Sequence, residues 1–297
     1  MTIGLIGTGL MGQPMALRLK QAGFNVAAYN RTRSKLELLE KEDIELADSV
    51  LDLVKRCDCV VLMVTNAEAI ASLVLTDEVK SHLKGCTILQ MSTISPEQSQ
   101  AIRDEVVAAG GEYVEAPVLG SIPQANDGSL QIMVGATPEQ FGRLQPVLQC
   151  LGSEPIHTGE VGTAAATKLA MNQLIGSLTT AFSLSLGLVQ QAGIDIDKFM
   201  SILRQSALYA PTFDKKLQRM VERNFENPNF PAKHLLKDMR LFIETAEHHG
   251  IDASLVESVA ALVQKAMNQG LADSDYSALY AAVNPVTANL KGQDETE

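Results

Sequence analysis

The sequence predicts an α/β protein that starts with a doubly wound, mostly parallel sheet and continues into a domain made only of helices. Three observations carry this prediction. In the first half of the chain, short apolar runs alternate with amphipathic segments, as in βαβ units. After about residue 162 the strand pattern ends and only helical segments follow. The chain has 297 residues, more than one hydrophobic core usually fills, so two domains are expected.

Six apolar runs are expected to form buried strands. They are Ile3–Ile6, Asn25–Tyr29, Cys59–Val64, Thr87–Met91, Tyr113–Ala116 and Gln131–Val134. Between the first of these runs, amphipathic helices are expected at Gly12–Ala22 and Ser34–Glu42. Right-handed crossovers place such helices on both faces, so the sheet should be covered on both sides.

A long helix is expected to connect the two halves. Residues Thr163–Ala192 contain no proline and are closed by Gly193, which predicts a helix of roughly 30 residues and about 45 Å. The helix is apolar around most of its surface, so we expect it to be buried on nearly every side. Further helices are expected at Asp197–Gln205, Pro211–Glu222, His234–His249 and Ser254–Gln269. The expected organisation is a doubly wound domain at 1–162, the connecting helix at 163–193, a helical domain at 194–290, and a polar tail at 291–297.

Composition excludes several classes of partner. With 24 basic and 35 acidic residues, the net charge is −11, which argues against nucleic acid or an anionic membrane. No apolar run reaches the roughly 18 residues of a membrane span, and the N-terminus lacks the basic flank of a signal peptide. The five histidines form no metal-binding pattern, so no metal site is expected. The cysteines follow no zinc or redox pattern and are expected to be reduced thiols of a cytoplasmic protein; they are Cys57, Cys59, Cys86 and Cys150.

The stretch GTGLMG, from Gly7 to Gly12, follows the first strand and opens the first helix. Gly7 should permit a tight turn, Gly9 should let backbone N–H groups approach a pyrophosphate, and Gly12 should allow close packing of helix on strand. The phosphate would then lie at the positive end of the helix. A glycine-rich turn without a ligand is the alternative, and the flanking strand, helix and second strand disfavour it. This loop, with Thr8, Leu10 and Met11, predicts a Rossmann domain that binds a dinucleotide.

The end of the second strand indicates which nucleotide binds. An NAD enzyme would carry Asp or Glu there to bind the ribose 2′-OH, whereas this chain has Asn30-Arg31-Thr32. No carboxylate repels a 2′-phosphate, Arg31 can pair with it bidentately, and Asn30 and Thr32 can add hydrogen bonds. Alternatively, Arg31 and Arg33 are a solvated helix start, although arginine is not favoured at the positive end of a helix. We therefore expect NADP(H).

Five motifs together resemble the β-hydroxyacid dehydrogenase family, which includes 3-hydroxyisobutyrate dehydrogenase. They span nearly the whole chain: GLIGTGLMGQPMA from Gly4, MSTISPE from Met91, EAPVLGSIPQANDGSLQIMVG from Glu115, GTAAATKLAMNQL from Gly162 and FPAKHLLKDMRL from Phe230. The third and fifth motifs are most similar to the glyoxylate/succinic semialdehyde reductase branch. The resemblance implies a Rossmann domain and hydride transfer between a nicotinamide cofactor and a small carboxylate-bearing aldehyde or hydroxy acid.

Lys168 and Asn172 are the candidate catalytic residues. They are four residues apart on the expected long helix, so they share one face. A lysine on a mostly apolar helix is costly unless its ammonium reaches a polar cleft; a snorkelling lysine is the alternative. The resemblance implies that Lys168 is the general acid/base and that Asn172 orients it and the substrate.

The resemblance also implies a carboxylate-binding segment after "APV", made of one serine hydroxyl and two small residues. Here the serine position is Leu119, followed by Gly120 and Ser121. The backbone donors remain, but one hydroxyl is lost; either Ser121 replaces it or the pocket prefers a different or longer substrate. Lys237 resembles the family lysine that reaches toward the cofactor, with Asp238 as its structural neighbour. A solvated lysine–aspartate pair is the alternative.

Two further segments are expected at the cofactor because they follow strands. Thr93 should line the nicotinamide pocket. Val64, Thr65 and Asn66 end the preceding strand, at the edge where an open sheet binds its ligand.

The sequence thus predicts an NADPH-dependent reductase of glyoxylate, succinic semialdehyde or a similar acid. Hydride delivery to the aldehyde leaves an alkoxide, and Lys168 would protonate it. An NAD(P)-linked 3-hydroxyisobutyrate dehydrogenase is the alternative, which Arg31 disfavours. A further alternative is a nucleotide-binding protein that has lost catalysis. The presence of Lys168 disfavours it, whereas Leu119 at the serine position favours it. Imine reductases are further relatives that usually replace the lysine.

A homo-oligomer, either a dimer or a tetramer, is expected. The helical half carries more apolar surface than a thin domain covers by itself. The residues concerned are Leu255, Val259, Leu262, Val263 and Leu279.

Overall fold

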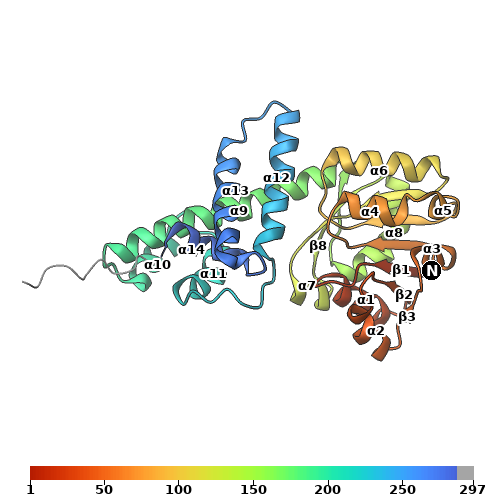
Figure 1. Cartoon of the computed structure of the whole chain (residues 1–297), viewed down its shortest axis with the longest axis horizontal. Coiled ribbons are helices and arrows are strands. Elements are labelled where there is room, and N and C mark those ends of the chain that lie inside the picture. The colour runs from red at the N-terminus through yellow and green to blue at the C-terminus, as the bar shows by residue number, and fades with distance from the viewer. Residues whose placement is uncertain (286–297) are drawn as a thin grey trace, which may run out of the picture. The chain divides into compact units, whose positions relative to one another are not determined.

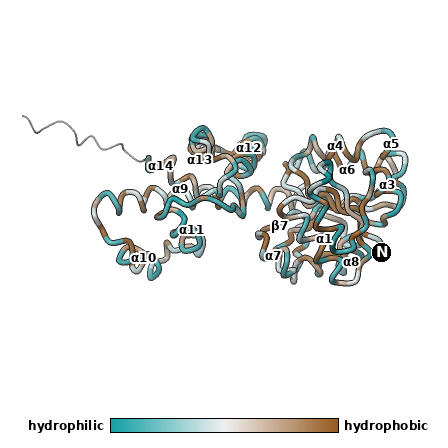
Figure 2. The backbone as a smooth tube through the Cα atoms, turned by 60° about the horizontal axis from the view of Figure 1, so that its bottom comes forward, coloured by the Kyte–Doolittle hydropathy of each residue, from teal (hydrophilic) through white to brown (hydrophobic). Residues whose placement is uncertain are grey.

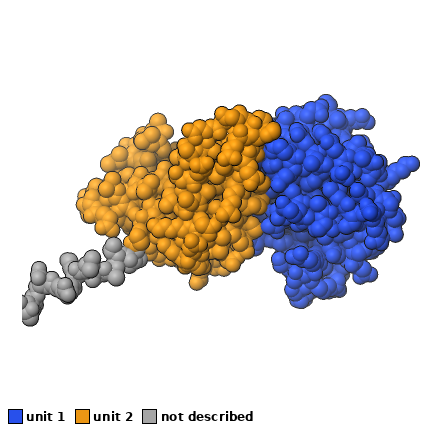
Figure 3. All heavy atoms as spheres, turned by 45° about the horizontal axis from the view of Figure 1, so that its top comes forward, with its two compact units in different colours: residues 1–171 blue, residues 172–297 orange. Residues whose placement is uncertain are grey.

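A computed structural model of the chain describes residues 1–285. The chain divides into two compact units, residues 1–171 and 172–297 (Figure 3). The division falls inside helix α9 (Thr163–Gln191), which contributes residues to both units. The expected domain boundaries at 162 and 193 stay predictions. The expected polar tail at 291–297 and the end of the expected helical domain lie outside the described residues.

The first unit is built on a nine-stranded sheet with the order β3-β2-β1-β4-β5-β6-β8-β7, and β9 pairs with β8. Strands β1 to β6 are parallel, and their order is that of the Rossmann fold. Strand β8 runs antiparallel to β6 and β7. The strands are β1 (Thr2–Ile6), β2 (Asn25–Tyr29), β3 (Glu45–Leu46), β4 (Cys59–Leu62), β5 (Thr87–Gln90), β6 (Glu112–Glu115), β7 (Val118–Leu119), β8 (Gln131–Gly135) and β9 (Ile156–Gly159). The predicted doubly wound sheet is confirmed.

Helices cover both faces of this sheet, as the alternation predicted (Figure 1). One hydrophobic core holds Leu19 of α1 and Leu148 of α8, and the other holds Leu53 of α3 and Ile102 of α6. Figure 2 shows the apolar strands gathered inside this unit, with hydrophilic segments around them. The helices are α1 (Gly12–Gln21), α2 (Glu37–Lys41), α3 (Val50–Arg56), α4 (Ala67–Val74), α5 (Asp77–Lys80), α6 (Pro96–Ala108), α7 (Ile122–Asp127) and α8 (Pro138–Leu151), with a 3₁₀ turn η1 (Arg33–Leu36).

The described part of the second unit is helical, as predicted. Ile175 of α9 packs in one cluster with α12 and α13, and Phe182 of α9 packs in another with α10 and α11. Gly176 allows close contact with α12, because a Cβ there would lie 2.9 Å from the Met239 sulfur. The elements after α9 are α10 (Ile196–Arg204), α11 (Pro211–Val221), α12 (Ala232–His248), α13 (Ser254–Ala266), η2 (Met267–Leu271), η3 (Tyr276–Ala278) and α14 (Leu279–Val283).

The expectation that α9 is buried on nearly every side is wrong for the single chain. Leu174, Leu184 and Leu188 are 48%, 56% and 72% exposed, and their spacing places them on one face of the helix. The opposite face packs into the two clusters of the second unit. Helix α9 is therefore amphipathic in its packing although its composition is apolar almost all round.

All four cysteines are buried and unpaired, which confirms the prediction of thiols. Burial raises the pKa of Cys57 to about 11, so its thiol stays protonated and unreactive at neutral pH. Among residues 1–285, no helix has both the length and the apolar composition that crossing a membrane requires.

Candidate active site

The glycine loop between β1 and α1 has the geometry of a phosphate cradle. Gly7 has φ of +96°, and a Cβ there would lie 2.3 Å from the Met63 carbonyl oxygen. A Cβ at Gly12 would lie 1.9 Å from the Gly7 carbonyl oxygen. At Gly9, no other group of the described residues lies within 4 Å of a Cβ position. The loop is thus closed at its two ends and open in its middle, where a pyrophosphate can approach the backbone.

Asn30 connects this loop to the end of β2. Its Oδ1 accepts from the Thr8 backbone N–H at 3.2 Å, and its Nδ2 donates to the Thr32 carbonyl at 3.0 Å. The Thr8 hydroxyl donates to the Lys35 carbonyl at 3.1 Å. Asn30 therefore links the glycine loop to the segment after β2 through the two ends of its amide, a role that the sequence did not indicate.

The two arginines after β2 differ in their partners. Arg33 forms an exposed ion pair with Glu40 at 3.0 Å. Arg31 is exposed, and its guanidinium has no hydrogen bond or ion pair within residues 1–285. Its five donors are available to an anion at the edge of β2.

The segments after β4 and β5 are joined by Ser92. Its hydroxyl accepts from the Val64 N–H at 2.8 Å and donates to the Leu62 carbonyl at 3.3 Å. Asn66 caps α4, accepting from the Ala69 N–H at 3.0 Å, and Thr93 is half-buried. These residues lie at the carboxyl edge of the parallel strands, where open sheets bind ligands. Sequence reasoning missed Ser92, although a small polar residue directly after a buried strand is a usable signal.

The segment Leu119-Gly120-Ser121 joins β7 to α7. Gly120 has φ of +143°, and a Cβ there would lie 2.7 Å from Leu130, so this position requires glycine. The Ser121 N–H and hydroxyl both donate to Gln124 Oε1, at 2.9 and 2.7 Å. The hydroxyl that could replace the missing serine is therefore engaged within the chain. Leu119 is half-buried.

Lys168 and Asn172 lie one turn apart on α9, so they share a face. Lys168 is 7% and Asn172 2% exposed. Within the second unit, Asn172 Nδ2 donates to Asp238 Oδ2 at 2.5 Å. Asn172 Oδ1 is buried and has no hydrogen-bond partner among the described residues. A buried acceptor of this kind is costly unless a donor reaches it.

Asp238 determines which way the Asn172 amide faces. Its carboxylate accepts from the amide N–H, which leaves the buried Oδ1 as an acceptor without a partner among the described residues. The Lys237 ammonium lies 3.0 Å from Asp238 Oδ1 and compensates the charge of this buried carboxylate. Asp238 is therefore more than a neighbour of Lys237, because it contacts Asn172 directly. The sequence did not indicate this contact, which joins residues 66 positions apart.

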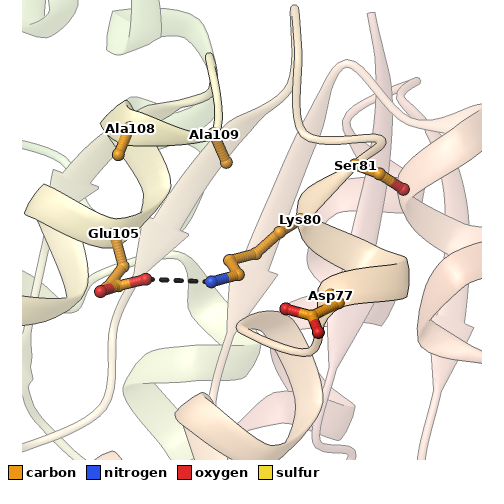
Figure 4. A pocket seen from close by; sticks show the side chains of 6 residues that line it. All are labelled: Asp77, Lys80, Ser81, Glu105, Ala108 and Ala109. Atoms are coloured by element: carbon orange, nitrogen blue, oxygen red, sulfur yellow. Dashed lines mark hydrogen bonds and ion pairs between the residues drawn. The ribbon is translucent and has the colours of Figure 1, made fainter.

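The remaining surface of residues 1–285 offers less of what a second functional site would require. A shallow pocket of about 370 Å³ lies between α5 and α6, beside the Lys80–Glu105 ion pair of 3.1 Å (Figure 4). Because α5 and α6 end where β5 and β6 begin, this pocket lies at the amino edge of the strands, opposite the glycine loop. Among residues 1–285, His, Cys, Asp and Glu side chains nowhere form a group of three that could hold a metal.

A Rossmann sheet with an open glycine loop, followed by helices with a buried lysine and amide, defines a nicotinamide-nucleotide-binding oxidoreductase. Residues 2–162 match the family model described as the NAD-binding domain of 6-phosphogluconate dehydrogenase. Residues 162–283 match the one described as NAD-binding of NADP-dependent 3-hydroxyisobutyrate dehydrogenase.

The chain is also similar to known proteins in sequence and in fold. Glyoxylate/succinic semialdehyde reductase 1 of Arabidopsis thaliana is 32% identical over 95% of this chain and 98% of its own. The human cytokine-like nuclear factor N-PAC is 29% identical over 94% of this chain but only 51% of its own. In fold, the chain is similar to 3-hydroxyisobutyrate dehydrogenase of Mycobacterium tuberculosis, with a TM-score of 0.87, 22% identity, and coverage of 95% and 98%. The chain belongs to the β-hydroxyacid dehydrogenase family, in its 3-hydroxyisobutyrate dehydrogenase-like group.

Proposed function

We propose that this protein is an NADPH-dependent reductase of short aldehyde acids such as glyoxylate and succinic semialdehyde. The observation that carries the proposal is the buried Lys168, one turn from an Asn172 whose amide is held by Asp238. The name of the Arabidopsis relative supports these two substrates.

Lys168 is the general acid of the proposed reaction. When bound, the reduced nicotinamide supplies a hydride to the carbonyl carbon, which leaves negative charge on the aldehyde oxygen. The Lys168 ammonium gives its proton to that oxygen, and in the oxidative direction the amine takes it back. Asn172 Oδ1 accepts a hydrogen bond from the ammonium or the substrate hydroxyl, which satisfies a buried acceptor.

The proposed cofactor site uses the carboxyl edge of the sheet. The loop from Gly7 to Gly12 binds the pyrophosphate, and Arg31 binds the 2′-phosphate, with Asn30 and Thr32 beside it. The proposed contacts of the nicotinamide half are Val64, Thr65, Asn66, Thr93 and Lys237. The open space at Gly9, and an Arg31 guanidinium without a partner among residues 1–285, support this assignment.

The proposed carboxylate site uses the backbone of Leu119, Gly120 and Ser121. Lys237 and Asp238, which form an ion pair, are further proposed substrate contacts. Because the Ser121 hydroxyl is engaged by Gln124 and Leu119 brings no hydroxyl, this site favours the longer succinic semialdehyde over glyoxylate.

We further propose that the protein acts as a homo-oligomer in the cytoplasm. Of the apolar residues expected to be uncovered, Val259, Val263 and Leu279 are buried in the second unit. The exposed leucines of α9 support self-association instead. The four buried thiols fit a reducing compartment.

A substrate panel tests the proposal. Each acid is assayed with NADPH and with NADH by the absorbance of the reduced nicotinamide, and 3-hydroxyisobutyrate is assayed with NADP⁺ and NAD⁺. We expect the highest kcat/KM for succinic semialdehyde with NADPH. Faster oxidation of 3-hydroxyisobutyrate with NAD⁺ would make the dehydrogenase the correct assignment. Tight NADPH binding without turnover of any acid would instead indicate a nucleotide-binding protein without this activity.

A further inference from the structure

Glu115, the last residue of β6, is a fully buried carboxyl group with four donors around it. Its Oε1 accepts from the backbone N–H groups of Gly162, Ala164 and Ala165, at 2.7, 2.9 and 3.2 Å. Its Oε2 accepts from the Ser99 hydroxyl at 2.5 Å. The side chain is 0% exposed, so these partners replace all of its water.

The three backbone donors belong to the start of α9. The first N–H groups of a helix have no acceptor within the helix, and here a side chain 47 to 50 residues earlier supplies one. The positive end of the helix also favours a carboxylate. Burial raises the pKa of Glu115, and the hydrogen bonds from Ser99 and the α9 backbone lower it. The acceptor oxygen can receive the three N–H groups in either protonation state.

The surroundings leave space for this side chain and hold it in place. Glu115 pairs across the sheet with Gly135 of β8, and a Cβ at Gly135 would lie 2.3 Å from Glu115 Oε1. From α6, the Ser99 hydroxyl also contacts the Tyr113 hydroxyl at 2.9 Å. Sheet, α6 and α9 are therefore joined at one carboxyl group.

Lys168 lies one turn beyond this cap. It is four residues after Ala164 and three after Ala165, the spacing at which helical side chains share a face. We propose that Glu115 is a positioning residue: by capping α9 it fixes the first turn of the helix and, with it, the place of Lys168. This inference rests on the proposed role of Lys168 in the reaction.

The test compares two substitutions of Glu115. Glu115→Leu leaves three buried N–H groups without an acceptor, whereas Glu115→Gln keeps an oxygen at the same position. We expect Glu115→Leu to lower kcat by roughly ten- to a hundredfold, because a displacement of about 1 Å can cost that much. The Kd for NADPH should stay unchanged, since the glycine loop follows β1, which β4 and β5 separate from β6 in the sheet. Glu115→Gln should retain most of kcat.

A second variant displaces the carboxyl group without replacing it. Gly135→Ala introduces a Cβ that Glu115 must avoid, so it should lower kcat as Glu115→Leu does. If Glu115→Leu does not fold, Gly135→Ala tests the positioning role of Glu115 in its place. The matched control is Thr137→Ala, which removes the hydroxyl that caps α8 in the same unit. It should lower Tm without changing kcat.

Two readouts separate this inference from the proposed function. Hydrogen exchange at Gly162, Ala164 and Ala165 measures the cap without any substrate; it should speed up in Glu115→Leu and Gly135→Ala but not in Glu115→Gln. Lys168→Ala, assayed beside them, measures the proposed chemistry.

Full activity in Lys168→Ala would refute the proposed function, while hydrogen exchange would still report whether Glu115 caps α9. An inactive Lys168→Ala together with wild-type kcat in a folded Gly135→Ala or Glu115→Leu variant would overturn the positioning role. A loss in Glu115→Gln as large as in Glu115→Leu would overturn it too.

Discussion

Arg31 is the residue on which the proposed choice of cofactor depends. Only NADPH carries the 2′-phosphate, so Arg31→Ala should weaken NADPH far more than NADH. A charge-assisted bidentate contact contributes roughly 1.5–3 kcal/mol, or about ten- to a hundredfold in Kd. Titration of the two cofactors by fluorescence measures this. Arg33→Ala, whose arginine pairs with Glu40, is the control. Equal losses for both cofactors in Arg31→Ala would show that Arg31 does not read the phosphate.

Leu119 is the residue on which the proposed substrate preference depends. Leu119→Ser adds one hydroxyl, and a hydrogen bond to a charged group contributes at best roughly 1.5–3 kcal/mol. We expect kcat/KM to rise for glyoxylate and to change little for succinic semialdehyde, with both acids assayed on both proteins. A uniform loss on both acids would instead mean that Leu119 packs as part of an apolar wall.

At this scale, the sequence indicated site residues from short motifs but did not indicate the contacts that join positions far apart in the chain. The close approach of Gly12 to the Gly7 carbonyl lies within one short motif and follows from its spacing, whereas Gly7 itself lies against the Met63 carbonyl. Glu115 and Asp238 act through partners more than 40 residues away. No spacing rule within a single sequence connects such positions.

His234, in the first turn of α12, makes the stability of this helical unit sensitive to pH. Burial, aided by the charges of Lys233 and Lys237, lowers its pKa from the ordinary value of 6.5. As pH falls through 6.5, the unfolded chain takes up a proton before the folded one does, so the free energy of unfolding falls with pH there. His234→Gln should make Tm fall less steeply over this range, measured by thermal unfolding at several pH values. His82→Gln, at an exposed histidine, should follow the wild type; identical slopes in all three proteins would exclude this role of His234.

Elements with a strong apolar period were predictable, and short or interrupted elements were not. Strands β1, β2, β4, β5, β6 and β8 lie within a few residues of their predicted ranges, because each is buried and mostly apolar. Strands β3 and β7 have only two residues each, and β9 is half-exposed. None of the three shows a run of apolar residues from which a strand could be predicted. Helix α13 ends at Ala266, three residues before the expected Gln269, and is followed by η2, in which Gly270 has φ of +84°.

At the scale of the whole molecule, the exposed face of α9 predicts self-association. Leu174, Leu184 and Leu188 lie on one face, and burying each such side chain contributes roughly 1.5–3 kcal/mol. Light scattering at micromolar concentration should give at least a dimer. The double variant Leu184→Glu with Leu188→Glu should shift the mass toward the monomer, whereas Leu38→Glu, at an exposed leucine of α2, should not. A monomeric wild type would contradict this prediction.

The central claim is that Lys168 supplies the proton for carbonyl reduction. The most direct measurement is kcat of Lys168→Ala with NADPH and succinic semialdehyde, with the NADPH Kd titrated in parallel. Thr167→Ala, at the neighbouring position of α9, is the control. Loss of a general acid should lower kcat by roughly 10²–10⁴ while the NADPH Kd stays unchanged. A Lys168→Ala protein that reduces the aldehyde as fast as wild type would contradict the account.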